Sequence, residues 1–410
     1  MGKRWQVWLI VLGGAALLSG CALHSATHAP GSAGCDLDKL GQRYALKEGE
    51  TVLTPQEVQR RAVINSGLGQ ALQTDGDDSE GHPCLACGAS QKRKRLSRIL
   101  KAYAADEVRN QSAALALDAY YRLAEARLQI RLAEQGKSLA DRMVTRAEEM
   151  KSKGLSLPQD LPTLRRQASE SVSDVVRLEL LRERLTEQLR QLADSELCTC
   201  KIGTIETFHV VDEEIEDCQA VAIGLKYRPD LNLLRAMLEN LEASTLPLIR
   251  KVLGGSNPLL GDRVRRCIPL AECLPRLLPL LAQGELEKVR KELTAILCER
   301  EKQAVSEIRQ AVSRVRATVR LAELAGNRES LARTRLAELK ERNDKGLSTE
   351  AEMPLAQRDH LKGRSDVLHA VINWEVARVE LRKAQGLLVR EVLGECDQCP
   401  GNEPATPPAP

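Results

Sequence analysis

The tetrapeptide Lys-Gly-Leu-Ser occurs at Lys153–Ser156 and again at Lys345–Ser348. Each copy follows a long stretch without proline, 92–153 in the first case and 285–345 in the second, in which helix-forming residues dominate. At about 1.5 Å per residue, each stretch would form a helix roughly 90 Å long. A second helical stretch follows each glycine-containing break. The recurrence therefore indicates an internal duplication and predicts one helical hairpin in each half of the chain.

Apolar residues behind the first break recur every three, four or seven positions, which is the spacing of a coiled-coil seam. They are Leu161, Leu164, Ala168, Val172, Val175, Leu178, Leu185, Leu189 and Leu192. Only 2% of the residues are aromatic and 29% are charged, a composition that suits long helices packed through a narrow seam. The fold class that we expect is all-α dominated, with two tandem long antiparallel hairpins.

Shorter elements are predicted outside the hairpins. Thr54 and Pro55 have the residue types of a helix cap and a first helical position. The β-branched run Ile202–Val211 predicts a short strand. A further helix is expected to begin after Arg228-Pro229-Asp230-Leu231 and to end near Thr245–Pro247.

The N-terminus has the layout of a secretory signal. Lys3 and Arg4 precede an apolar stretch, 5–18, which leads to Leu18-Ser19-Gly20-Cys21. This tetrapeptide resembles the bacterial lipobox, in which the cysteine is lipidated, and Ala22 behind it favours sorting to the outer membrane. An ordinary signal peptide or an uncleaved anchor is the alternative.

These features divide the chain into five parts. We expect a lipoprotein signal peptide at 1–20, a lipidated tether at 21–50, a first hairpin repeat at 51–215 and a second at 216–395. The proline-rich tail, 396–410, is expected to be disordered.

Three further segments, taken with the duplication, resemble the TolC-like outer-membrane efflux protein family. They are Leu53–Ser66, Arg228–Leu231 and Asn373–Gly386, which correspond to the opening segment, the start of the second repeat and the end of the last helix. The resemblance implies a homotrimeric helical tunnel on a membrane β-barrel, acting as the exit duct of a tripartite system. Its partners would be a periplasmic adaptor and an inner-membrane pump, and the lipid on Cys21 would add a membrane anchor.

The same resemblance assigns the hairpin tips to adaptor contact. The residues concerned are Gly154, Leu155, Ser156, Gly346, Leu347 and Ser348. The alternative is that each glycine simply ends a helix and its neighbours form the turn.

Two segments depart from the family pattern. Strands of a membrane barrel need about ten residues of alternating character and aromatics at both interfaces. Neither 66–91 nor 248–281 has them, so the barrel strands are expected to be degenerate or missing. Without a barrel, the lipid on Cys21 would be the only anchor. The leading prediction remains a passive duct, and the alternative is a lipid-anchored periplasmic scaffold with no transport activity.

The 12 cysteines include two Cys-x-x-Cys pairs, which together with a nearby histidine offer zinc-ligand chemistry. The candidates are His82, Cys84, Cys87, Cys396 and Cys399. In an exported protein, disulfides are the favoured reading and a metal site is the weaker one.

Other classes of function find no support in the sequence. A formal net charge of +3 gives no reason to expect a nucleic-acid partner. The sequence contains no nucleophile elbow, phosphate-binding loop or metalloprotease spacing, so neither catalytic residues nor a cofactor are predicted. The basic run Lys92–Arg95 would face lipid headgroups or begin a solvated helix.

Overall fold

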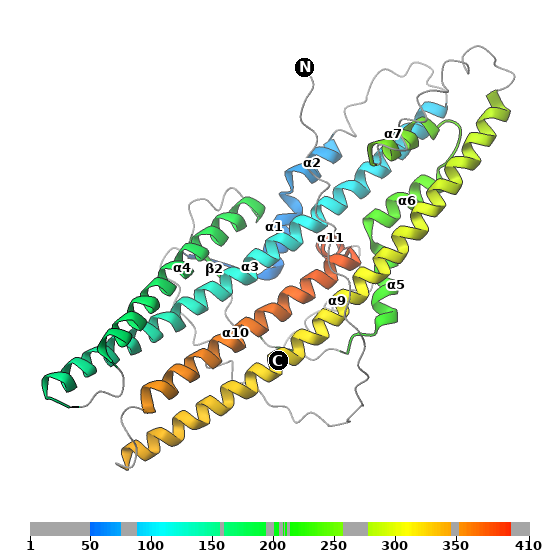
Figure 1. The fold of residues 1–410 in the computed structure, drawn as a ribbon. Coiled ribbons are helices and arrows are strands. Elements are labelled where there is room, and N and C mark those ends of the chain that lie inside the picture. The colour runs from blue at the N-terminus through cyan, green and yellow to red at the C-terminus, as the bar shows by residue number, and fades with distance from the viewer. Residues whose placement is uncertain are drawn as a thin grey trace, which may run out of the picture. The chain divides into compact units, whose positions relative to one another are not determined.

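A computed structural model describes residues 50–74, 88–155, 160–193, 201–204, 208, 210, 214–256, 278–345 and 352–394. Four long helices account for most of them (Figure 1). The signal peptide, the tether and the C-terminal tail that the sequence predicts all lie outside these ranges.

The first hairpin consists of α3 (Gly88–Ser152) and α4 (Leu161–Ala193), which pack against each other along the length of α4. With 65 residues, α3 is roughly 100 Å long at 1.5 Å per residue. It begins four residues before the proline-free stretch that predicted it. Of the seam residues in α4, Leu164, Leu185 and Leu189 are buried as the apolar spacing requires, whereas Val172 is exposed.

The second hairpin consists of α9 (Leu278–Asp344) and α10 (Glu352–Gln385). The two hairpins join through α10, which packs on α9 and also on α3. The long helices therefore lie in the neighbour order α4, α3, α10 and α9 (Figure 1). Two tandem hairpins and an all-α-dominated fold are thus confirmed.

Shorter helices and strands pack against the long helices at the end of the hairpins opposite to the turns. They are β1 (Glu50–Leu53), α1 (Pro55–Ile64), α2 (Gly67–Thr74), β2 (Lys201–Thr204), α5 (Asp217–Tyr227), α6 (Pro229–Glu239), α7 (Leu246–Ser256) and α11 (Leu387–Leu393). The strands pair in parallel, with Glu50 opposite Lys201 and Leu53 opposite Thr204. Strand pairing thus links the start of the first repeat to the segment that precedes the second.

Two predictions about the short elements need correction, and one helix was not predicted. The strand expected at Ile202–Val211 is Lys201–Thr204 in the described residues, because pairing is limited by the four-residue length of β1. The helix that begins at Pro229 ends at Glu239 rather than near Thr245. The hydroxyl of Thr245 donates to the carbonyl oxygen of Asn240 (2.6 Å) and accepts from the amide of Glu242 (3.0 Å), and these bonds shape a turn there. Helix α5 had no counterpart among the sequence predictions.

The segments in which membrane strands were considered contain helices where the structure describes them, at Gly67–Thr74, the start of α3, Leu246–Ser256 and the start of α9. Their remainders, 75–87 and 257–277, lie outside the described residues. Within the part of the chain that can be searched, no helix combines the length and the apolar character needed to cross a bilayer.

Small residues build the main core. Along α3, Ala113, Ala116, Ala119 and Ala124 are fully buried, and they let α1, α4 and α10 approach closely. Tyr120 is one of the few aromatic residues, and its ring is fully buried. Its hydroxyl donates to the carbonyl oxygen of Leu53 at 2.9 Å and so ties β1 to α3.

Candidate functional site

At the first hairpin tip, the end of α3 is capped by hydrogen bonds and carries an exposed apolar side chain. Gly154 has φ +69° and ends α3, and the amide of Leu155 donates to the carbonyl oxygen of Met150 at 2.9 Å. This is the hydrogen-bond pattern of a Schellman cap, which a glycine in the left-handed region permits. The Leu155 side chain is 54% exposed, so the turn presents it to solvent.

The start of α4 is fixed in a complementary way. The carboxylate of Asp160 accepts from the amide of Thr163 (3.1 Å) and from its hydroxyl (2.9 Å), and these bonds lower the pKa of Asp160. Arg165 then pairs with Glu148 on α3 at 2.7 Å across the hairpin. Each arm of the tip is therefore fixed by hydrogen bonds at the end of its own helix.

The remaining tip residues of the sequence prediction are Ser156, Gly346, Leu347 and Ser348, and they lie outside the described residues. The helix ends beside the second tip are described. Leu336, Leu339 and Ala356 form a small buried cluster there, with Met353 packed against it. This cluster braces α9 against α10 close to the turn.

The two outermost long helices carry exposed apolar rows, each on one helix. On α4, Val172, Val176 and Leu180 follow one another at intervals of four residues and are 41–57% exposed; we call them the α4 row. On α9, Leu321, Leu324 and Leu331 are 53–72% exposed; we call them the α9 row. Apolar side chains spaced in this way lie on one side of a helix and can pack against another helix.

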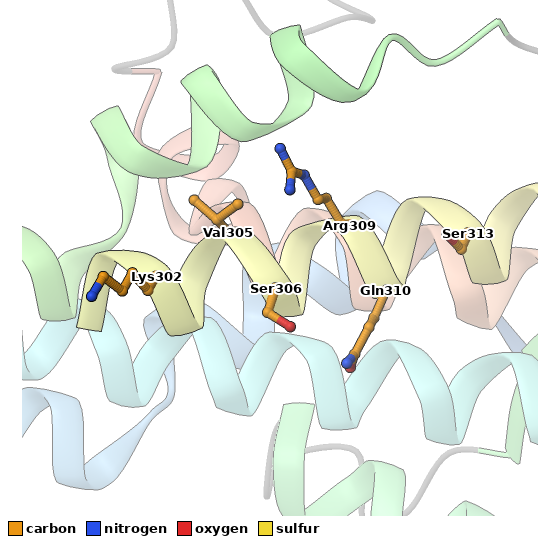
Figure 2. A pocket seen from close by; sticks show the side chains of 6 residues that line it. All are labelled: Lys302, Val305, Ser306, Arg309, Gln310 and Ser313. Carbon is orange, nitrogen blue, oxygen red and sulfur yellow. The ribbon is translucent and has the colours of Figure 1, made fainter. Parts of the chain in front are cut away.

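A shallow hollow of about 420 Å³ also follows α9. Figure 2 shows its six lining side chains, all from this helix: Lys302, Val305, Ser306, Arg309, Gln310 and Ser313. In this view Val305 and Arg309 point to one side of the helix, whereas Ser306 and Gln310 point to the other (Figure 2). Because one helix supplies every lining residue, the hollow is an open part of the α9 flank.

The motif Arg228–Leu231 lies at the centre of a charged joint. The side chain of Arg228 is 9% exposed and forms a bidentate ion pair with Asp230, in which both hydrogen bonds measure 3.0 Å. It also donates to Glu307 on α9 (2.5 Å) and to the carbonyl oxygen of Ala384 at the end of α10 (3.2 Å). The joint thus ties α6 to both arms of the second hairpin.

Arg300 completes the joint from α9, at 2.7 Å from Asp230 and 3.1 Å from Glu307. Burial opposes ionisation of Asp230, but the bonds from Arg228 and Arg300 outweigh it and lower the pKa of this carboxyl. Glu107 on α3 lies nearby, and burial raises its pKa. The pKa values of the two neighbouring carboxyls are thus shifted in opposite directions, and only the one with guanidinium partners is lowered.

The structure brings the Arg228 motif against the last motif of the resemblance. Gly386 has φ +73° at the α10–α11 junction, where a Cβ would lie 2.9 Å from the Cα of Arg228. In the same motif, Trp374 is 1% exposed, and the guanidinium of Arg378 lies 4.8 Å from its ring centroid. Asn373 accepts a bond from Arg122 on α3 at 3.0 Å.

The opening segment has structural roles as well. The hydroxyl of Thr54 accepts from the amide of Glu57 (3.1 Å) and caps α1, as its residue type predicted. Asn65 donates to the carbonyl oxygen of Ala193 at the end of α4 (2.7 Å). The three motifs that carry the family resemblance thus join helices to one another.

The metal and disulfide candidates cannot be placed, because His82, Cys84, Cys87, Cys396 and Cys399 lie outside the described residues, as does Cys21. Within the described ranges, no group of three or more suitable side chains could hold a metal ion. Cys218 and Cys298 are exposed free thiols.

The basic run at the start of α3 contacts the connection between α6 and α7. Lys92 pairs with Glu242 at 2.8 Å, and Arg93 donates to the carbonyl oxygen of Ser244 at 3.1 Å. The sequence suggested that this run either faces lipid headgroups or begins a solvated helix. In the structure, Lys92 and Arg93 interact with partners from the protein itself.

No protein-family model matches the chain, and no curated protein sequence does so either. Solved structures do match. The outer membrane channel CmeC of Campylobacter jejuni is 13% identical over 90% of this chain and 94% of its own, with a TM-score of 0.57. The outer membrane protein VceC of Vibrio cholerae is 13% identical over 81% of this chain and 96% of its own, with a TM-score of 0.55.

The outer-membrane channel OprN is similar to the same degree, at 13% identity over 81% of this chain and 89% of its own, with a TM-score of 0.55. At such identities the likeness concerns the fold. The chain has the fold of the TolC-like outer-membrane channels, and the resemblance read from its motifs is confirmed at that level.

Proposed function

We propose that this chain is an efflux or secretion component of the outer membrane, which works as a passive duct rather than as a catalyst. The observation that carries the proposal is the match to an outer membrane channel over 90% of this chain and 94% of that one. A likeness that extends over nearly the whole of both chains includes the two hairpins and the elements that join them.

In this proposal three copies associate side by side into a tube. The long helices have the neighbour order α4, α3, α10 and α9, so α4 and α9 form the outer flanks of each copy. Exposed apolar rows on both flanks support a contact in which the α4 row of one copy meets the α9 row of the next. Such a head-to-tail contact uses two different surfaces and closes into a ring when the rotation allows it.

The tips are proposed to dock a periplasmic adaptor, which would connect the duct to an inner-membrane pump. Support comes from the first tip, where the capped end of α3 presents Leu155 to solvent. An apolar side chain whose own backbone is fixed by a helix cap can enter a partner's pocket at a lower ordering cost. Gly154, Ser156, Gly346, Leu347 and Ser348 belong to the same proposal.

Attachment to the membrane is proposed to involve lipid on Cys21, with the helical part facing the periplasm. A Cys21→Ser variant with an ordinary cleavable signal separates this anchor from any other. Retention in the outer membrane after carbonate extraction would support the duct, because something besides the lipid must then hold the protein. Release as a soluble periplasmic protein would favour the lipid-anchored scaffold instead.

Assembly provides the sharpest test. Native mass spectrometry of the full chain in detergent should give a trimer for the wild type. Val176→Glu and Leu324→Glu should dissociate it, because each puts a charge into an apolar contact, at a cost of several kcal/mol. Arg177→Glu is the matched control, since its side chain is exposed next to the α4 row and should leave the trimer intact. A monomeric wild type would contradict the duct.

A further inference from the structure

A second hollow lies between the two hairpins and differs in kind from the one along α9. It has a volume of about 290 Å³, and three helices supply its walls. The lining residues are Gln135, Ser138, Leu139 and Arg142 from α3, Leu336 from α9, and Gln357, His360, Leu361 and Arg364 from α10. We call it the inter-hairpin pocket.

The polar side chains that line this pocket are neutral or basic. Two guanidinium groups, two side-chain amides, a hydroxyl and an imidazole converge on it, and none of its nine lining residues is acidic. The apolar part is confined to three leucines. The two guanidinium groups can only donate hydrogen bonds, and they suit a ligand that carries oxygen acceptors and negative charge.

The two arginines of the pocket have few interactions within the described residues. Neither Arg142 nor Arg364 makes an ion pair or a hydrogen bond to another described side chain, unlike most arginines of the long helices. Burial lowers the pKa of the Arg364 guanidinium, and the charge of Glu329 on α9 offsets that effect only in part. A desolvated cation without a hydrogen-bonded partner is costly, so an anion bound beside it would be stabilising.

Glu329 is the acidic group closest to this arrangement, and it is already engaged. The Nε2 atom of His360 lies 3.0 Å from its Oε1 atom, so the carboxylate holds the imidazole from the α9 side. A Cβ at Gly363 would lie 3.1 Å from the Cα of Glu329, which means that the backbones of α9 and α10 touch behind the pocket. The wall that carries His360 and Arg364 is therefore preformed.

We propose that the inter-hairpin pocket binds a small oxyanion, namely a carboxylate or phosphate compound, between Arg142 and Arg364. Planar guanidinium groups bind both anions through paired N–H donors, and the amides of Gln135 and Gln357 can supply further donors. The volume is close to the lower limit of about 300 Å³ for small-molecule sites, which restricts the ligand to a compact anion. Such a ligand would bridge the hairpins and stabilise their packing.

The test is isothermal titration calorimetry of the full chain in detergent, with citrate as the carboxylate probe and inorganic phosphate as the second probe. Sodium chloride at matched ionic strength serves as the blank. We expect saturable binding of at least one probe at one site per chain, with Kd below about 1 mM. Binding of citrate alone would identify the carboxylate as the ligand, and binding of phosphate alone would identify the phosphate.

Single substitutions test whether the probe binds at the inter-hairpin pocket. Arg142→Gln and Arg364→Gln should each weaken binding by roughly tenfold or more, because each removes charge-assisted hydrogen bonds. Arg358→Gln is the matched control, since Arg358 is an exposed arginine on α10 that does not line the pocket. Arg142 is also exposed, so its variant is expected to fold normally.

Thermal unfolding gives an independent readout. The bound probe should raise the midpoint of the wild type and of Arg358→Gln, but not that of the two pocket variants. Without a probe, Arg364→Gln should unfold at the same temperature as the wild type or higher, because it removes a partly buried cation that has no hydrogen-bonded partner among the described side chains. Absence of saturable binding to the wild type, or equal binding by all three variants, would overturn the proposal.

Discussion

Replacing Arg228 with methionine should destabilise the protein strongly, although the substitution keeps an unbranched side chain of similar length. The change removes both bonds to Asp230 (3.0 Å each), the bond to Glu307 (2.5 Å) and the bond to the carbonyl oxygen of Ala384 (3.2 Å). Removing one partner of a buried ion pair typically costs about 3–5 kcal/mol, because the other charge stays desolvated.

The structure indicates the lower end of that range. Arg300 stays within 2.7 Å of Asp230 and 3.1 Å of Glu307, so neither carboxylate is left without a cation. The side chain of Glu307 is also 44% exposed, and water can solvate it. We therefore expect a loss of about 3 kcal/mol in the free energy of unfolding for Arg228→Met.

Urea-induced unfolding followed by far-UV circular dichroism measures this loss. Arg177→Met is the control, since that arginine is 79% exposed, pairs with Asp174 at 3.5 Å and should cost less than about 0.5 kcal/mol. A double-mutant cycle with Asp230→Leu should give a coupling energy above about 1 kcal/mol. Equal losses for Arg228→Met and Arg177→Met, or no measurable coupling, would refute the reasoning.

Three further predictions concern single positions. Leu189→Ala should lower the free energy of unfolding by about 2–5 kcal/mol, because Leu189 is fully buried, whereas Leu180→Ala on the exposed α4 row should change it by less than about 0.5 kcal/mol in the monomer. Gly386→Ala should cost at least about 1 kcal/mol by the same urea assay, since φ is +73° there and the new Cβ would crowd Arg228; an unchanged midpoint would contradict that geometry. The lowered pKa of Asp230 stabilises the fold above the usual aspartate pKa of about 4 and less as the pH falls below it, so unfolding midpoints measured from pH 5 to 2 should fall less steeply in Asp230→Asn than in the wild type.

Local patterns in the sequence predicted the hairpins well, because a helix depends on neighbours within a few residues. The proline-free stretches became α3 and α9, and Gly154 ends α3 in the left-handed conformation that glycine favours. The apolar seam of α4 predicted its buried face at Leu164, Leu185 and Leu189. Val172 departed from the pattern, since the side of α4 on which it lies has no neighbouring helix within the described chain.

Contacts between distant segments required the tertiary structure. The parallel pairing of β1 with β2 joins residues about 150 positions apart, and no local pattern specifies such a partner. The meeting of Arg228 with Gly386 likewise depends on how α6 and α10 pack, although both motifs were visible in the sequence. The inter-hairpin pocket was not predicted at all, because its arginines have the same spacing as those of any solvated helix face.

By itself, then, the sequence determined the number of hairpins, the positions of their turns and the resemblance to a family of outer-membrane proteins. Helix propensity, capping residues and apolar spacing act over one or two turns of chain, and their effect can be read directly from the order of residues. The tertiary structure decided that α10 lies between α9 and α3, which apolar rows face outward, and which charges meet across helices. These outcomes depend on the packing of surfaces that are far apart in the chain, and only the folded arrangement brings those surfaces together.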